Sequence, residues 1–111
     1  ASQYKEKGGL YEGAYKRMHS NGNPWVEASY LHDKKHGNYK AYYADGTLRF
    51  ECNYKYNRKN GVLKKYNKNG KLLMEEKYNE GVRDGICKYY DDKGKLLYTL
   101  TYKDDVVIKV N

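Results

Sequence analysis

The sequence predicts an all-β fold, an elongated single-layer antiparallel meander of four β-hairpin repeats with short caps at both ends. Three observations predict it. Glycines recur every 24 residues without insertion, Asn-Gly or Asp-Gly pairs stand near the middle of three copies, and a tyrosine closes each copy. A fixed period in this range is typical of repeat proteins, in which each unit buries its apolar side by stacking on its neighbours.

The 111 residues are expected to form one domain. An N-terminal cap is expected over residues 1–12, because Gly9 to Gly13 has the spacing of Gly81 to Gly85. A closing strand is expected over residues 104–111, and its apolar edge either folds back or pairs with a second copy, which Lys109 opposes. Between them lie repeats over residues 13–36, 37–60, 61–84 and 85–108.

Asn-Gly or Asp-Gly between alternating segments is a strong hairpin signal. A two-residue type I′ turn at Asp45-Gly46 sets the register of the second repeat. It pairs Ala44 with Thr47, Tyr43 with Leu48, Ala41 with Phe50 and Tyr39 with Cys52.

Side chains alternate between the two faces of a strand, so this register separates an apolar face from a charged one. The apolar face collects Tyr39, Ala41, Tyr43, Leu48, Phe50, Cys52 and Tyr54, with Val26, Leu72, Met74, Leu96, Tyr98 and Leu100 as equivalents elsewhere. The charged face pairs Lys16 with Glu27, Lys40 with Glu51 and Lys64 with Glu75. Beside these pairs stand Tyr42, Tyr66 and Tyr90, which we interpret as support for the sheet, with a ligand-stacking platform as the alternative.

The formal net charge of +8 and the pI of about 9.3 favour an anionic partner: an acidic protein, lipid head groups or a glycan. The alternative interpretation is that the net positive charge only keeps the protein soluble. Eighteen lysines stand against four arginines. Base-edge and bidentate phosphate recognition rely on arginine, so sequence-specific binding of nucleic acid is not expected.

The connections between repeats, such as residues 31–36 and 55–60, all lie along one edge of the predicted meander. They carry six lysine and arginine residues, with little acid beyond Asp33, Glu80 and Asp84, so this edge is the candidate binding site. Trp25 is a further candidate anchor, with packing over Met18 as the favoured alternative. The candidate partner-binding residues are Lys34, Lys35, His36, Lys55, Arg58, Lys59 and Arg83 at the edge, with Tyr42, Tyr66, Tyr90 and Trp25.

The sequence contains no Gly-rich phosphate loop, no nucleophile elbow and no recognisable catalytic triad. An enzymatic role is therefore not expected, and no catalytic residue, cofactor or metal ligand is assigned. The one ligand-like group is His32-x-x-x-His36 with Asp33 between, and a solvated loop is the favoured interpretation there.

The sequence holds no apolar run of about 18 residues, so no transmembrane helix is predicted. The first residue is Ala1, which suggests a mature exported chain or a trimmed one, and we favour an exported or cell-surface location over a cytoplasmic one. Cys52 and Cys87 are separated by three strand steps of about 4.8 Å, whereas a disulfide needs Cα atoms within about 7 Å. Both are therefore predicted to be free thiols in the apolar face, Cys52 near Leu63 and Cys87 near Leu100.

Residues Gly37 to Tyr54 read Gly-x-Tyr-Lys-x-Tyr-Tyr-x-Asp-Gly-x-Leu-x-x-Glu-x-x-Tyr. In this pattern the chain resembles the bacterial variant of the MORN (membrane occupation and recognition nexus) repeat, over essentially Gly9 to Tyr102. The first repeat departs from it at Met18, His19, Pro24 and Trp25.

The resemblance implies an elongated, twisted meander of hairpins that serves binding and scaffolding rather than chemistry. Family members include YwqK-type antitoxins, exported surface proteins and eukaryotic relatives linked to membranes. Our leading hypothesis is a non-enzymatic, exported or surface-associated binding module that offers a basic, tyrosine-rich sheet to a protein or anionic partner. The alternative is a cytoplasmic antitoxin or immunity protein that neutralises a partner toxin.

Overall fold

The protein is an open antiparallel sheet, seen in a computed structural model that describes residues 5–7 and 10–111, with side chains from residue 13 onward. Eight strands form the four predicted hairpins: β2 (Leu10–Met18) with β3 (Pro24–Leu31), β5 (Gly37–Tyr42) with β6 (Leu48–Lys55), β8 (Gly61–Tyr66) with β9 (Leu72–Asn79), and β11 (Gly85–Tyr90) with β12 (Leu96–Lys103). The ends are β1 (Lys5–Lys7) and β13 (Val106–Val110), and the short strands β4 (Lys34–Lys35), β7 (Arg58–Lys59) and β10 (Val82–Arg83) lie in the connections.

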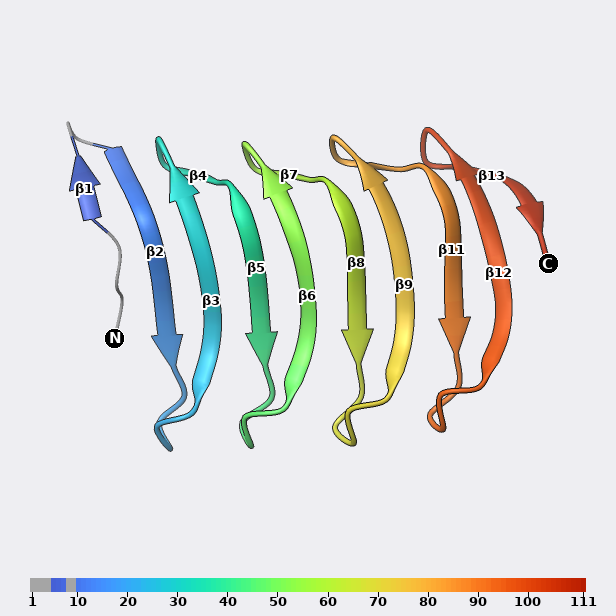
Figure 1. The fold of residues 1–111 in the computed structure, drawn as a ribbon, viewed down its shortest axis with the longest axis horizontal. Helices are drawn as coiled ribbons and strands as arrows, with labels where there is room; N and C mark the ends of the chain where they lie inside the picture. The colour runs from blue at the N-terminus through green and yellow to red at the C-terminus, as the bar shows by residue number, and fades with distance from the viewer. Residues whose placement is uncertain (1–4, 8–9) are drawn as a thin grey trace.

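The strands lie side by side in one layer, in chain order from β1 to β13 (Figure 1). The molecule measures 48 × 33 × 12 Å, and the shortest dimension leaves room for a single sheet only. This confirms the predicted all-β meander. In the described residues we find no helix long and apolar enough to cross a membrane.

In the part of each hairpin away from its turn, the two strands pair in the predicted register. Tyr39 pairs with Cys52 and Ala41 with Phe50. On the charged face the three predicted pairs join into one row, because each glutamate also pairs with the lysine of the next repeat. The row runs Lys16, Glu27, Lys40, Glu51, Lys64, Glu75, Lys88 and Thr99. Opposite charges at neighbouring positions stabilise the pairing along its whole length.

The predicted two-residue turn at Asp45-Gly46 is wrong. The Gly46 N–H donates to the Tyr43 carbonyl and the Tyr43 N–H to the Thr47 carbonyl, at 3.0 and 2.8 Å. This is a three-residue loop, a type I turn followed by Gly46 at φ +92°. Leu48 therefore pairs with Tyr42 rather than Tyr43, and Tyr43 with Thr47 rather than Leu48, which leaves Ala44 in the loop.

A β-bulge restores the predicted register beyond that loop. The register shifts by one residue between Ala41 and Tyr42 of β5, which makes Arg49 the additional, bulged residue of β6. The first hairpin shifts in the same way between Arg17 and Met18. Met18 consequently pairs with Pro24, and the expected register of Trp25 opposite Met18 is wrong.

Type I′ turns occur at the other edge of the sheet, where the sequence suggested longer connections. Two residues with positive φ connect β3 to β4, β6 to β7, β9 to β10 and β12 to β13. They are His32-Asp33, Tyr56-Asn57, Glu80-Gly81 and Asp104-Asp105. Positive φ at both central residues defines this turn, and its twist matches that of the flanking strands.

The core is a thin apolar layer on one face of the sheet. Its buried members are Ala28, Ala41, Cys52, Leu63, Cys87 and Tyr102. The layer weakens toward the C-terminus, where Tyr98, predicted on this face, is 43% exposed. The predicted placement of three leucines on this face is wrong, because the shifted register pairs them with tyrosines of the charged face: Leu48 with Tyr42, Leu72 with Tyr66 and Leu96 with Tyr90.

Both ends of the predicted domain organisation carry strands. The closing strand predicted over residues 104–111 is β13, which pairs with β12 and is exposed along its length. At the other end β1 pairs with β2, while residues 1–4 and 8–9 of the predicted cap lie outside the described residues.

Candidate binding surface

The candidate surface is built on the edge that carries the type I′ turns, because these turns hydrogen-bond to one another. The Asn57 N–H donates to the Lys35 carbonyl at 2.8 Å, Gly81 to Lys59 at 2.7 Å, and Asp105 to Arg83 at 2.9 Å. Side chains add to the contact, since the Asn57 side-chain oxygen accepts from the Lys35 N–H at 2.7 Å. Each basic residue is thus fixed by the turn of the following repeat.

Three of these basic side chains pack on tyrosine rings of the next repeat. The Lys35 ammonium lies 5.0 Å from the Tyr54 ring centre. Lys59 lies 5.1 Å from Tyr78, and the Arg83 guanidinium 4.3 Å from Tyr102. Such cation–π contacts contribute about 0.5–1 kcal/mol each at exposed sites.

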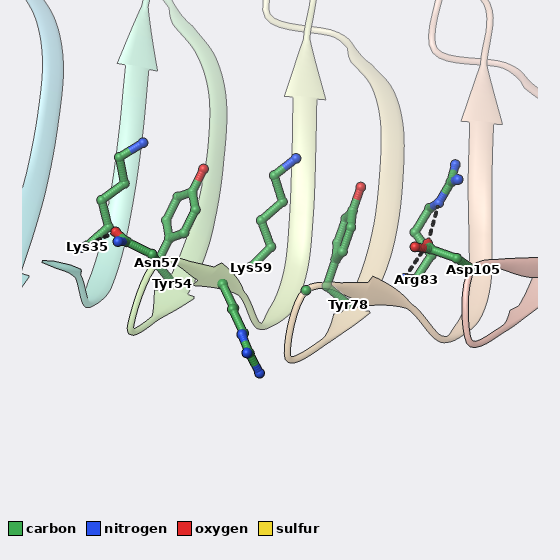
Figure 2. A pocket seen from close by; sticks show the side chains of 9 residues that line it. Lys35, Tyr54, Asn57, Lys59, Tyr78, Arg83 and Asp105 are labelled. Carbon is green, nitrogen blue, oxygen red and sulfur yellow. Dashed lines mark hydrogen bonds and ion pairs between the residues drawn. The ribbon is translucent and has the colours of Figure 1, made fainter.

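Each cation also pairs with a tyrosine of its own hairpin, because Lys35 is in register with Tyr30, Lys59 with Tyr54 and Arg83 with Tyr78. Aromatic and cationic side chains therefore alternate along the edge. Figure 2 shows Lys35, Tyr54, Lys59, Tyr78 and Arg83 extending side by side in the same direction from the turns. We call this set the cation–tyrosine row: Tyr30, Lys35, Tyr54, Lys59, Tyr78, Arg83 and Tyr102.

An open groove of about 550 Å³ follows the row from Lys35, at the end of the first repeat, to Asp105 in the fourth. Its lining includes Lys35, Tyr54, Lys59 and Tyr78, with Arg58 exposed beside Gly81. Burial raises the pKa of Tyr54 to about 12.

The three cations of the row differ in their acidic partners. The Arg83 Nε–H and backbone N–H both donate to Asp105 Oδ1, at 3.1 and 2.8 Å, which holds the pKa of that carboxyl below its usual range. The Arg83 guanidinium is also 3.9 Å from Glu76. Among the described side chains, no carboxylate forms an ion pair with Lys35 or Lys59.

Sequence reasoning missed Glu76, a carboxylate on the apolar face. It is 7% exposed and accepts hydrogen bonds from the Tyr78 and Tyr89 hydroxyls at 2.8 and 2.9 Å. Burial together with these bonds raises the pKa of both tyrosines. The repeat phase could have found it, since Glu76 stands 24 residues after Cys52 and 24 before Leu100, both predicted on that face.

The remaining edge candidates lie outside the row. Lys34 and Lys55 are exposed, and Lys55 pairs with Glu80 at 3.4 Å. The His36 ring lies 4.6 Å from that of Tyr56 and accepts from the Tyr56 N–H at 3.3 Å. Within the described residues, no group of three His, Cys, Asp or Glu side chains is placed to hold a metal ion.

The tyrosines of the charged face are placed far from the row, on the opposite side of the sheet. The Tyr42 hydroxyl donates to Glu27 and that of Tyr66 to Glu51, the latter at 3.1 Å. Burial and the Glu27 bond raise the pKa of Tyr42 to about 12. Each ring thus ties its repeat to the preceding one, while the equivalent Tyr90 is half-buried at the end of β11.

Trp25 is 38% exposed and follows the turn of the first hairpin, and it lines a second open groove together with Tyr30 and Lys35 of the row. The Arg17 guanidinium lies 4.6 Å from its ring centre, and the His19 ring stacks on it at 5.6 Å. From the predicted set, the structure therefore brings together Lys35, Arg58, Lys59 and Arg83 in one groove and places Trp25 beside Lys35 in a second. The charged-face tyrosines lie on the opposite side of the sheet.

An open meander of stacked hairpins, with a repeated surface motif on one edge, defines a β-hairpin repeat protein. Comparison with known families matches residues 35–56, 59–80 and 83–104 to the MORN repeat variant, and these segments cover more than half of the chain. The chain belongs to this family. Its members' repeats generally mediate binding. A search of curated proteins found no match.

The matched units begin at Lys35, Lys59 and Arg83, two residues before the glycines that opened the predicted repeats. Each unit therefore starts on a cation of the row. The match leaves out most of the first predicted repeat, residues 13–36, which is where the sequence departs from the pattern.

Proposed function

We propose that the protein is a non-enzymatic binding module whose cation–tyrosine row receives an anionic segment of a protein partner. The observation that carries this proposal is the repetition of one cation–tyrosine contact in three successive repeats. A solubilising lysine would project into solvent, whereas Lys35 and Lys59 are half-buried and lie over rings. Family membership supports a binding role, and the net charge of +8 supports an anionic partner.

The non-enzymatic part of the proposal is supported by the chemistry of the buried groups. Glu76 is closed off by two tyrosine hydroxyls and by Arg83. The thiols of Cys52 and Cys87 are buried, and burial raises the pKa of both, which lowers the fraction present as reactive thiolate. These arrangements suit a rigid platform better than a reacting centre.

The test is binding of a poly-glutamate peptide to the wild-type chain and to the double variant Lys35→Glu/Lys59→Glu, measured by titration calorimetry. We expect the double variant to lose at least about tenfold in affinity, roughly 1.4 kcal/mol. The wild-type affinity should also fall as salt rises, because exposed charges are screened.

The matched control is Lys93→Glu/Lys95→Glu, which changes the net charge equally at exposed positions next to Gly94, on the opposite edge. The proposal fails if both double variants weaken binding to the same extent, since overall charge would then be the cause. Circular dichroism of all variants checks that they fold.

Export and the antitoxin role stay predictions. A signal segment in the precursor would support export. Loss of a toxin's activity on mixing with this chain would support the antitoxin role.

A further inference from the structure

We propose that the row reads a polyproline II segment with acidic side chains at every third position, two of which bind Lys35 and Lys59. This inference rests on the proposed function and specifies its ligand. It comes from the spacing of the cations, from their unequal pairing with acids and from the rings between them.

The spacing follows from the sheet. Lys35 and Lys59 are equivalent positions one repeat apart, and a repeat contributes two strands. Neighbouring strands lie about 4.8 Å apart, so equivalent positions recur about every 9.6 Å along the edge. The ten successive strands of the sheet, spread over a 48 Å axis, agree with this interval.

A polyproline II helix has three residues per turn and a rise of about 3.1 Å per residue. Side chains at positions i and i+3 therefore point the same way about 9.3 Å apart, close to the interval between the two lysines. A β-strand repeats a side-chain direction every second residue, about 6.7 Å, which does not match. An α-helix matches only about every seventh residue and presents a cylinder about 10 Å wide to a shallow groove.

The ion pairs that the three cations already form determine how many acidic residues the bound peptide segment needs. Lys35 and Lys59 have no carboxylate ion-pair partner among the described side chains. Arg83, one interval further, is already held by Asp105 at 3.1 Å and lies 3.9 Å from Glu76. The ligand therefore gains from acids at i and i+3 and gains nothing from a third at i+6.

The Tyr54 ring, between the two lysines, suits the residues that separate the two acids. It lies in the groove with Lys35 against it and Lys59 in register with it (Figure 2). Polyproline II segments dock in aromatic-lined grooves, because their conformation is preformed and proline packs on rings. Proline between the acids would keep the segment extended and place an apolar surface over Tyr54.

The test compares peptides of equal length and charge by titration calorimetry. One repeats Glu-Pro-Pro, a second holds the same residues with the glutamates adjacent, and a third is an alanine-rich helix with glutamates every seventh residue. We expect the first to bind at least about tenfold more tightly than the others. Lys35→Glu/Lys59→Glu should abolish this preference, and Lys93→Glu/Lys95→Glu should keep it.

Two peptide variants test the count of acids. In a peptide with a single Glu-Pro-Pro-Glu unit, a third glutamate at i+6 should change the affinity by less than about twofold, whereas replacing either of the first two by glutamine should weaken it at least about fivefold. Equal gains from every added glutamate would overturn the inference.

The outcomes separate this inference from the proposed function. If all acidic peptides bind equally and the double variant loses them all, the binding site stands and the periodic ligand falls. If no peptide binds, both fall. If vesicles of anionic phospholipid or single-stranded DNA bind more tightly than Glu-Pro-Pro through the same two lysines, the ligand is a membrane or a nucleic acid and the inference is overturned.

Discussion

Glu76 on β9 and Tyr89 on β11 are joined by a hydrogen bond of 2.9 Å across neighbouring strands, inside a layer that is otherwise apolar. The same carboxylate accepts from Tyr78 and lies near Arg83, which belongs to the cation–tyrosine row. A buried charge is tolerated when its oxygens are hydrogen-bonded, and removing it leaves its partners unsatisfied. Glu76 thus connects the core of the third repeat to the binding edge.

The first prediction is that Glu76→Ala lowers the free energy of unfolding by about 2–3 kcal/mol, because the half-buried Tyr78 and Tyr89 hydroxyls lose the charged acceptor of their hydrogen bonds. Urea denaturation measures this. The control Glu80→Ala removes an exposed carboxylate that pairs with Lys55 and should cost less than about 1 kcal/mol. Equal costs for the two would show that the Glu76 bonds add nothing to stability.

The second prediction separates the observed turn from a two-residue type I′ turn. In the turn from Asn67 to Gly70 the Gly70 N–H donates to the Asn67 carbonyl. Of the Asn69-Gly70 pair only Gly70 has a positive φ, at +82°. Gly70→Ala should therefore destabilise by about 1–2 kcal/mol through backbone strain alone, since a Cβ there meets nothing within 4 Å. Asn69→Ala should cost less than about 0.5 kcal/mol, because its backbone is unstrained. A type I′ turn at Asn69-Gly70 would make both substitutions costly.

The hairpin turn at Asp45-Gly46 was predicted with the wrong type, yet the strand register predicted from it is correct away from the turn. Glycine after Asn or Asp satisfies both turn types, so Asp45-Gly46 did not distinguish them. The longer loop moves the register by one residue, and the extra residue Arg49 moves it back. Asn67 and Asp91 at the first turn position, where type I turns favour Asn and Asp, carried the missing signal.

The candidate site was predictable only in part. Meander topology placed Lys35, Lys59 and Arg83 on one edge, because every connection between repeats lies there. Which of them packs on a ring and which is paired with an acid depends on turns that meet only in the fold, such as Asp105 against Arg83. The sequence distance of 22 residues between these two gives no sign of that contact.

The third prediction concerns alkaline pH. Burial raises the pKa of several tyrosines above the ordinary value of about 10: Tyr30, Tyr39, Tyr42, Tyr54, Tyr66, Tyr78 and Tyr89. Above about pH 10 the unfolded chain therefore binds fewer protons than the folded one. The stability that these neutral hydroxyls contribute is fully present below that pH and is lost as the pH rises from about 10 toward 12.

Urea denaturation at several pH values between about 8 and 11 measures the fall, and tyrosinate absorbance should appear together with unfolding. Lysines also titrate in this pH range and change the stability of every variant alike. The effect of one tyrosine is therefore isolated by comparing the pH dependence of single tyrosine variants with that of the wild type. Tyr42→Phe should show a shallower fall than the wild type, and Tyr56→Phe, at an exposed position, should match the wild type. A wild-type stability that stays constant up to pH 11 would contradict the prediction.

The last prediction concerns Cys52 and Cys87, which are free and buried, as the strand spacing indicated. Cys52 is on β6 and Cys87 on β11, so β8 and β9 stand between them. They are 2% and 0% exposed, and burial raises the pKa of both thiols, which lowers the fraction of reactive thiolate. In the folded chain a thiol reagent should therefore react with both much more slowly than with glutathione.

In denaturant, without reductant, two thiols per chain should titrate at once, and the Cys52→Ala and Cys87→Ala variants should each show one. An intramolecular bridge in the mass spectrum of unreduced monomer would contradict both the free thiols and the strand order that separates them.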